Sequence, residues 1–119
     1  MEWNQLNSIH QLSEIDQESK STLVLIFKHS ITCGISATAL NRIERNWQQT
    51  DSSVIKPYYL DLLNHRAVSN AIENHYKIEH QSPQVLVIKN GKCIYTTTHN
   101  AIRYDDLLEE VLKQQVVMK

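Results

Sequence analysis

The chain has 119 residues, enough for one compact domain and too few for two ordinary ones. Its 41% hydrophobic and 21% charged residues are typical of a soluble globular protein, and a formal net charge of −1 offers no general attraction to nucleic acid or anionic membranes. No apolar run approaches the ~20 residues of a membrane span, and the polar first residues are unlike a signal peptide. We therefore expect one cytoplasmic domain over residues 1–119, with neither nucleic acid nor a membrane as partner.

Helical and strand patterns alternate in the first half of the chain. Residues 8–18 predict a helix, because a capping-box pair precedes a periodic apolar face. The continuous apolar run over 23–27 is typical of a central strand buried on both faces. A second helix is expected from Cys33 to about residue 48, with Ile35 on its inner face.

The next two elements are a strand and a third helix. Residues 54–61 predict a strand, and Pro57 within it favours a sheet edge, since proline has no N–H for the ladder. Asn64 is expected to cap the helix that follows, which ends near residue 76.

An antiparallel hairpin and a last helix complete the pattern. The apolar run over 85–88 and the segment 92–98 flank Asn90-Gly91, the strongest short hairpin signal, and a helical pattern covers 105–115. Parallel strands joined by a helix, followed by a hairpin, indicate an α/β domain. We expect a thioredoxin-like fold, with a central four-stranded mixed sheet flanked by helices and an extra N-terminal helix.

Cys33 stands where a buried strand gives way to the first turn of a helix. Unpaired backbone N–H groups and the positive end of the helix dipole point at this position, and both favour a thiolate. The thiolate is the species that attacks a disulfide sulfur. Because Thr32 and Gly34 are polar or small, the sulfur is expected to be approachable, and we interpret Cys33 as a nucleophile of thiol–disulfide exchange.

Ser36 occupies the place, three residues on, where a dithiol oxidoreductase has its second cysteine. On a helix this offset lies on the same face, so the hydroxyl is expected to hydrogen-bond the Cys33 thiolate. A serine cannot form a disulfide, and a mixed disulfide on Cys33 would therefore be cleared by an external thiol. The Cys-x-x-Ser pattern is a weak signal that gains weight from its position after a buried strand.

Ser82-Pro83 lies directly before the apolar run over 85–88. In thioredoxin-fold enzymes a proline in this place is cis and faces the active-site thiol, which leaves the preceding backbone free to pair with an extended substrate segment. The alternative is a trans proline that merely begins a strand.

Three motifs carry a family resemblance. They are Lys28-His29-Ser30-Ile31-Thr32-Cys33-Gly34-Ile35-Ser36, His80-Gln81-Ser82-Pro83-Gln84 and Thr97-Thr98-His99. Together they resemble the monothiol bacilliredoxin (YtxJ-like) family, over a stretch from about Leu23 to the C-terminus. The resemblance implies a thioredoxin-fold protein of bacteria that use bacillithiol in place of glutathione, with a role in removing bacillithiol from protein mixed disulfides.

The resemblance also assigns roles to matching residues. It implies that Cys33 is the attacking thiol, Ser36 the non-resolving position and Pro83 the cis-proline. The chain departs from the family at Gln81, where an acidic residue is expected, and at Arg103, where a threonine would cap a helix. The residues expected to form the active-site loop and substrate-binding surface are His29, Ser30, Thr32, Gly34, Ile35, Ser82, Pro83 and His99.

The implied partners are bacillithiol, as co-substrate, and bacillithiolated cytosolic proteins. Attack by Cys33 on the bacillithiol sulfur would free the protein thiol, and a second bacillithiol would restore Cys33. No permanently bound cofactor is expected, and no metal, because no histidine pair has the spacing of a helical zinc site. We expect a monomer.

Two other functions stay open at this point. Cys33-Gly34-Ile35-Ser36 is similar to the Cys-Gly-Phe-Ser motif of monothiol glutaredoxins, which carry an iron–sulfur cluster, although this chain lacks their glutathione-binding Gly-Gly segment after the hairpin. A non-enzymatic adaptor would keep the fold and leave Cys33 unreactive.

His29 and Cys93 each have two interpretations. An imidazolium at His29 would favour the Cys33 thiolate if the ring pointed at it, and a purely structural histidine is the alternative. Cys93 on the hairpin is expected to be a small packing residue. A disulfide between the two cysteines is not expected, because their Cα atoms would have to lie within about 7 Å.

Overall fold

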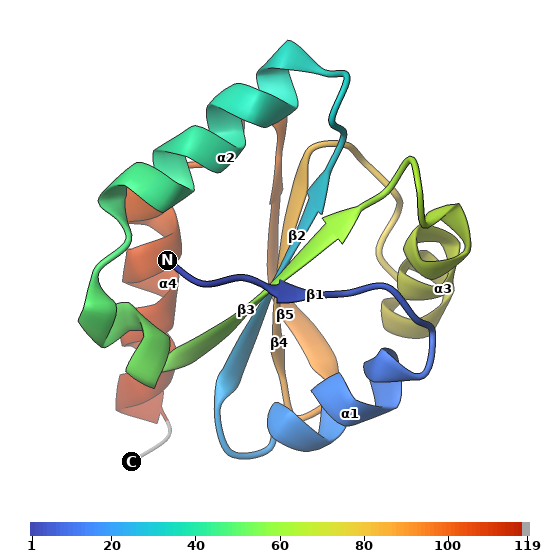
Figure 1. Ribbon diagram of the computed structural model, residues 1–119. Helices are drawn as coiled ribbons and strands as arrows, with labels where there is room; N and C mark the ends of the chain where they lie inside the picture. The colour runs from blue at the N-terminus through green and yellow to red at the C-terminus, as the bar shows by residue number, and fades with distance from the viewer. Residues whose placement is uncertain (118–119) are drawn as a thin grey trace.

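The computed structural model describes residues 1–117, with side chains described as far as Gln114. Figure 1 shows a central sheet with helices on both sides. Within the described residues no helix has both the length and the apolar character needed to cross a membrane. In chain order the elements are β1 (Asn4–Gln5), α1 (Gln11–Glu18), β2 (Leu23–His29), α2 (Gly34–Asn46), η1 (Gln49–Ser53), β3 (Ile55–Asp61), α3 (Arg66–Tyr76), β4 (Gln84–Lys89), β5 (Lys92–Thr98), η2 (His99–Ala101) and α4 (Tyr104–Val117).

The sheet has five strands in the order β1-β3-β2-β4-β5. β2 pairs in parallel with β3 and antiparallel with β4, and β5 pairs antiparallel with β4. β1 pairs in parallel with β3 at Tyr58 and Tyr59. The expected thioredoxin-like α/β class is confirmed, with five strands instead of four because two residues near the N-terminus add a short edge.

β3 is not an edge strand, contrary to the expectation from Pro57. Pro57 lies opposite Leu25 of β2, and β1 begins to pair one residue further along, at Tyr58. The proline is tolerated because the ladder with β1 is so short. In addition, the side-chain amide of Asn4 donates to the Pro57 carbonyl at 3.0 Å, which supplies a bond where the ladder has ended.

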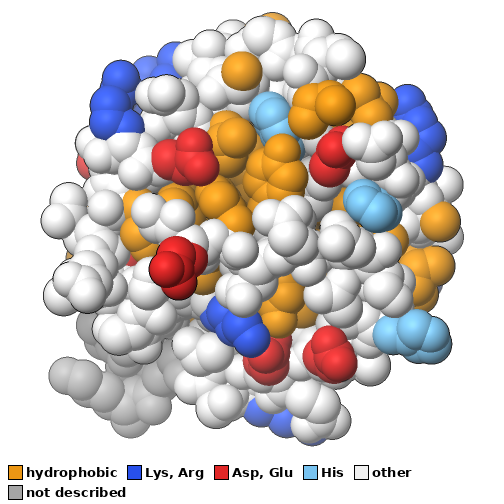
Figure 2. Space-filling model, in the orientation of Figure 1, with side chains coloured by type: hydrophobic (Ala, Val, Ile, Leu, Met, Phe, Trp, Pro, Cys, Tyr) orange, Lys and Arg blue, Asp and Glu red, His pale blue; other side chains and the backbone are white. Residues whose placement is uncertain are grey.

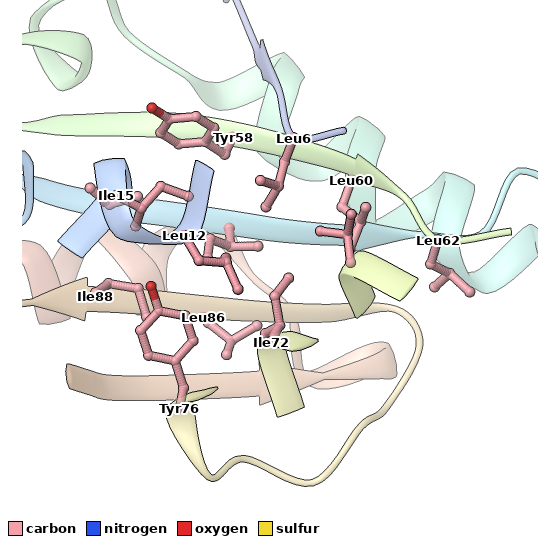
Figure 3. Packing of buried hydrophobic residues seen from close by; sticks show 13 residues of the cluster. Leu6, Leu12, Ile15, Tyr58, Leu60, Leu62, Ile72, Tyr76, Leu86 and Ile88 are labelled. Atoms are coloured by element: carbon pink, nitrogen blue, oxygen red, sulfur yellow. The ribbon is translucent and has the colours of Figure 1, made fainter. Parts of the chain in front are cut away.

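Each face of the sheet carries its own apolar core. Helices α1 and α3 cover one face, and α2 and α4 cover the other (Figure 1). Alternation along β2 accounts for this division, since Ile26 belongs to the first core and the adjacent Phe27 to the second. Figure 3 shows the first core, in which Ile15 of α1 and Ile72 of α3 project toward the sheet.

The hairpin expected at Asn90-Gly91 is confirmed. The two residues have φ values of 52° and 74°, the left-handed conformations that a type I′ turn requires. β4 and β5 pair on either side of this turn, with one irregularity in register between Val87 and Ile88.

The starts of the first three helices differ from expectation. α1 begins at Gln11, three residues after the expected start at residue 8. α2 begins at Gly34, with Cys33 as its N-cap residue, and Ile35 is 44% exposed because this first turn projects beyond the end of the sheet (Figure 1). α3 begins at Arg66, so Asn64 lies too far ahead to cap it. The amide of Asn64 donates instead to Oδ2 of Asp61 at 2.6 Å, within the turn that leaves β3.

Candidate active site

Strand register brings three segments to one end of the sheet. Lys28 near the end of β2 pairs with Gln84 at the start of β4, so Pro83 lies beside the segment that follows β2. β5 ends opposite the start of β4, and there the N–H of His99 donates to the Pro83 carbonyl at 3.1 Å. The loop ahead of α2, the proline and the exposed His99 therefore share one end of the molecule.

Cys33 occupies the entrance to α2 at this end. Its N–H donates to the Ser30 carbonyl at 3.1 Å, and its own carbonyl accepts from the N–H of Ala37 at 3.0 Å. These two bonds hold its backbone at the N-cap position, where no side chain caps the helix. The N–H groups of the first turn are thus left for an anion or a thiolate. The sulfur is a free thiol on a partly exposed residue.

The approach to Cys33 is open and has apolar borders. Ile31 and Ile35 are 55% and 44% exposed, on either side of the cysteine in the chain. A Cβ added at Gly34 would meet nothing within 4 Å, so no neighbouring atom closes over that residue. Thr32 is also exposed, and its Oγ1 lies 3.5 Å from Oγ of the buried Ser30.

Ser36 is oriented differently from the sequence-based expectation. The residue is fully buried, and its Oγ lies 2.7 Å from Nδ1 of His29 and accepts from the N–H of Ser30 at 3.0 Å. Within the described residues it makes no hydrogen bond to Cys33, because both of its contacts draw the hydroxyl toward the end of β2. Ser36 therefore anchors the first turn of α2 to β2.

His29 lies beneath this anchor, among aromatic rings. It is buried, and the centroid of its ring lies 6.1 Å from that of Phe27 and 5.6 Å from that of Tyr59. Figure 2 shows apolar side chains gathered at the centre of one face of the molecule.

Burial decides the charge of His29. It lowers the pKa of His29 below its ordinary value, although the carboxylates of Asp61 and Glu44 oppose that shift. The ring is therefore neutral near pH 7. Because the ring is neutral and bonded to Ser36, the geometry favours the second of the two interpretations of His29, a structural histidine, over an imidazolium acting on Cys33.

Asp61 is a residue of this end that the sequence did not single out. It lies opposite His29 in the register of β2 and β3. Its Oδ1 is buried without a hydrogen-bond partner among the described residues, while Oδ2 accepts from Asn64. An acidic residue at the end of a predicted strand was the available signal.

The Ser82–Pro83 peptide bond is cis, as the resemblance implied. Pro83 is buried beside the end of β2. The Oγ of Ser82 is also buried, and it has no hydrogen-bond partner among the described residues. An unpartnered buried hydroxyl costs roughly 1–3 kcal/mol, so a bound group that paired with it would gain stability.

A buried lysine supports the segment that leads to Pro83. Lys28 is completely buried, and its Nζ donates to the Ser69 carbonyl at 3.4 Å and lies 3.2 Å from Nδ1 of His80. Burial lowers the pKa of Lys28 to about 8, with Glu73 opposing the shift. Burial, and then the charge of Lys28, lower the pKa of His80, which keeps that ring neutral. The contact of Lys28 with Ser69 and His80 was not predicted from the sequence, where the only signal was a lysine near the end of a buried strand.

Cys93 lies apart from these groups. Its S–H donates to the Tyr95 carbonyl at 3.3 Å, and burial raises the pKa of the thiol. Both cysteines are free thiols. Over the described part of the chain, no group of three or more His, Cys, Asp or Glu side chains could hold a metal ion.

Solved structures share this architecture. One, described as an oxidoreductase with a thioredoxin fold, is 30% identical with a TM-score of 0.77, and the match covers 88% of this chain and 89% of that one. A thioredoxin from Malassezia sympodialis has a TM-score of 0.74 at 14% identity, covering 94% of this chain and 90% of its own. A thioredoxin from Fasciola hepatica has a TM-score of 0.69 at 15% identity, covering 92% and 97%.

A family model matches most of the chain. The model described as Monothiol bacilliredoxin BrxC matches residues 4–107, which include the loop ahead of α2, the cis-proline and His99. The structural match at 30% identity has the same fold, and it spans most of both chains. The chain therefore belongs to the monothiol bacilliredoxin BrxC family, with the thioredoxin fold and a role in thiol redox chemistry.

Proposed function

We propose that Cys33 removes bacillithiol from protein mixed disulfides, with bacillithiol as co-substrate and no permanently bound cofactor. The observation that carries this proposal is the position of the Cys33 thiol, partly exposed at a helix entrance without a side-chain cap, at the same end of the sheet as the Pro83 segment. Cys93, by contrast, donates its S–H to a backbone carbonyl and has a raised pKa, which disfavours the thiolate.

The reaction is two successive exchanges. The Cys33 thiolate attacks the bacillithiol sulfur of the modified protein, a new S–S bond forms, and the protein thiolate leaves and takes a proton from water. The thiolate of a second bacillithiol then attacks the bacillithiol sulfur bound to Cys33. Bacillithiol disulfide forms and the Cys33 thiolate is released, so no electrons are lost or gained overall.

Ser36 supports the single-cysteine form of this cycle. A serine has no sulfur with which to resolve the mixed disulfide, and this one is buried against His29. The adduct on Cys33 therefore persists until an external thiol reaches it. The free first-turn N–H groups of α2 would stabilise the leaving Cys33 thiolate in that step.

The surroundings of Cys33 suit a protein substrate. Ile31 and Ile35, each two residues from Cys33 in the chain, present exposed apolar surface, which is common at the centres of protein interfaces.

The direct test is intact-mass spectrometry of the reduced protein after exposure to bacillithiol disulfide, with glutathione disulfide in parallel. We expect one bacillithiol adduct per chain, formed faster than the glutathione adduct and discharged by free bacillithiol. Cys93→Ser should behave like wild type, whereas Cys33→Ser should form no adduct. Equal, slow adducts on both cysteines, or none on Cys33, would overturn the proposal.

A further inference from the structure

A cavity of about 320 Å³ lies between α2 and the start of α4. Arg42 is about two and a half helical turns beyond Cys33, or ~13 Å further along the axis of α2. The cavity is therefore separate from the thiol site and takes no part in the proposed exchange. Its lining residues are Arg42, Arg45, Asn46, Arg103, Tyr104 and Asp105.

Positive charge dominates this lining. Three arginines and one acidic residue, Asp105, line the cavity. Arg42 and Arg45 lie three residues apart on α2 and so on one face of the helix, and Arg103 approaches from the start of α4. Among the described residues none of the three arginines makes an ion pair or a side-chain hydrogen bond. Figure 2 shows Lys and Arg side chains at the upper left margin, on the side of α2 in Figure 1.

Like charges gathered without partners repel one another, and an anion among them would remove that cost. Guanidinium groups remain charged at any physiological pH and bind carboxylate and phosphate oxygens through paired N–H donors. The unpaired arginines therefore supply the donors that an anionic ligand needs.

The start of α4 adds to this attraction. Arg103 precedes the first residue of α4, and its carbonyl accepts from the N–H of Leu107 at 3.1 Å, so it stands at the positive end of the helix. The Tyr104 hydroxyl donates to Oδ2 of Asp51 at 2.6 Å, which holds this wall of the cavity in place. Arginine at this position replaces the threonine that the family resemblance implied, so a positive charge stands in place of a simple helix cap.

We infer that this cavity, called the arginine pocket below, binds a small anion that carries two or more phosphate or carboxylate groups. Its volume lies at the lower end of small-ligand sites, which are ~300–1,000 Å³. A small molecule of this chemistry pairs with several guanidinium groups at once, whereas one singly charged group would leave two of the three unpaired.

The test titrates the full chain with pyrophosphate and with citrate at low salt, by calorimetry and by backbone amide NMR shifts. We expect saturable binding by at least one probe, with shifts centred on 42–46 and 103–105. Arg103→Thr should weaken the affinity by about tenfold, as does the loss of a charge-assisted contact. Arg66→Gln, at the exposed first residue of α3, removes the same charge elsewhere and should change the affinity by less than about twofold.

The arms of this experiment separate the alternatives. Binding of pyrophosphate alone assigns a phosphorylated ligand, and binding of citrate alone assigns a polycarboxylate; either supports the inference. Absence of saturable binding by both probes, or equal weakening by Arg103→Thr and Arg66→Gln, overturns it. Because Cys33→Ser should bind the probes like wild type, failure of the redox proposal and failure of this one are distinguishable.

Discussion

At the scale of single residues, the geometry around Cys33 depends on side chains that do not react. The Ser36 hydroxyl ties the first turn of α2 to His29 and to the backbone of Ser30. His29 stays neutral because it is buried, and its ring fills space between Phe27 and Tyr59. The first turn of α2, which follows Cys33, is thus held by a buried polar contact that packs against aromatic rings.

Ser36→Ala should lower the free energy of unfolding by about 1–3 kcal/mol, because it leaves two buried polar groups without their shared partner. Urea denaturation measures this directly. The matched control is Thr38→Ala on the exposed face of the same helix, where the hydroxyl donates to the Gly34 carbonyl, and it should cost less than about 0.5 kcal/mol. Equal losses in both variants would contradict the anchoring role.

His29 should make the protein less stable as the pH falls from about 7 to about 5. The unfolded chain takes up a proton near the ordinary value of 6.5, while the lowered pKa of the buried ring means that the folded state binds it only at lower pH. The unfolded state therefore binds more protons in this window, and stability rises with pH across it. The free energy of unfolding, measured by denaturation at several pH values, should rise less steeply with pH for His29→Asn than for wild type. Part of the pH dependence should remain, because the pKa of His80 is also lowered by burial. An unchanged slope would show that His29 is not the titrating group.

At the scale of elements, the two glycines serve different turns. Gly91 has a φ of +74° in the hairpin, which only glycine adopts without cost, whereas Gly34 begins α2 without a left-handed φ. A Cβ at Gly91 would lie 3.7 Å from Cγ of Asp16, an ordinary contact, so any cost there comes from the backbone.

Gly91→Ala should therefore destabilise the protein by about 1 kcal/mol, the cost of a left-handed residue with a Cβ. Gly34→Ala should be neutral or stabilising by about 0.5 kcal/mol, because alanine favours the helix and the space is open. Thermal unfolding of both variants beside wild type measures the difference. A larger loss at Gly34 than at Gly91 would contradict this account of the two turns.

At the scale of the whole molecule, β2 joins both cores and the active-site end. All of its residues are buried, and its side chains alternate between the α1–α3 face and the α2–α4 face. Near the end of this strand Lys28 links the sheet to α3 through Ser69 and to the segment before Pro83 through His80. One buried amine thus connects three parts of the fold.

The stability of wild type relative to Lys28→Met should rise by up to about 3 kcal/mol as the pH increases from about 8 to about 10.5. In this window the unfolded lysine keeps its proton and the folded one loses it, because burial lowers the pKa of Lys28 to about 8. Comparing the two proteins by denaturation at each pH cancels the other titrating groups. Lys20→Met, which removes a lysine at an exposed position of the α1–β2 turn, is the matched control. A constant difference for Lys28→Met would contradict the buried charge.

Local patterns along the chain were enough to determine the order of elements, the Asn90-Gly91 turn and the position of Cys33 at a helix entrance. Periodicity, turn residues and capping act over a few neighbouring residues, so the sequence shows them directly. The same patterns misplaced Ile35, because the exposure of a first helical turn depends on where the sheet ends. They also misplaced Asn64, because its side chain bonds Asp61 in the turn after β3 and does not cap α3.

Contacts between distant segments were decided only by the tertiary structure. The direction of the Ser36 hydroxyl, the neutral state of His29 and the unpartnered Asp61 oxygen follow from how β2, β3 and α2 come together. The link from Lys28 to His80 and the arginine pocket likewise join residues far apart in the chain. Hydrogen bonding and burial act through space, and the register that brings these groups together is set by the pairing of whole strands and the packing of whole helices.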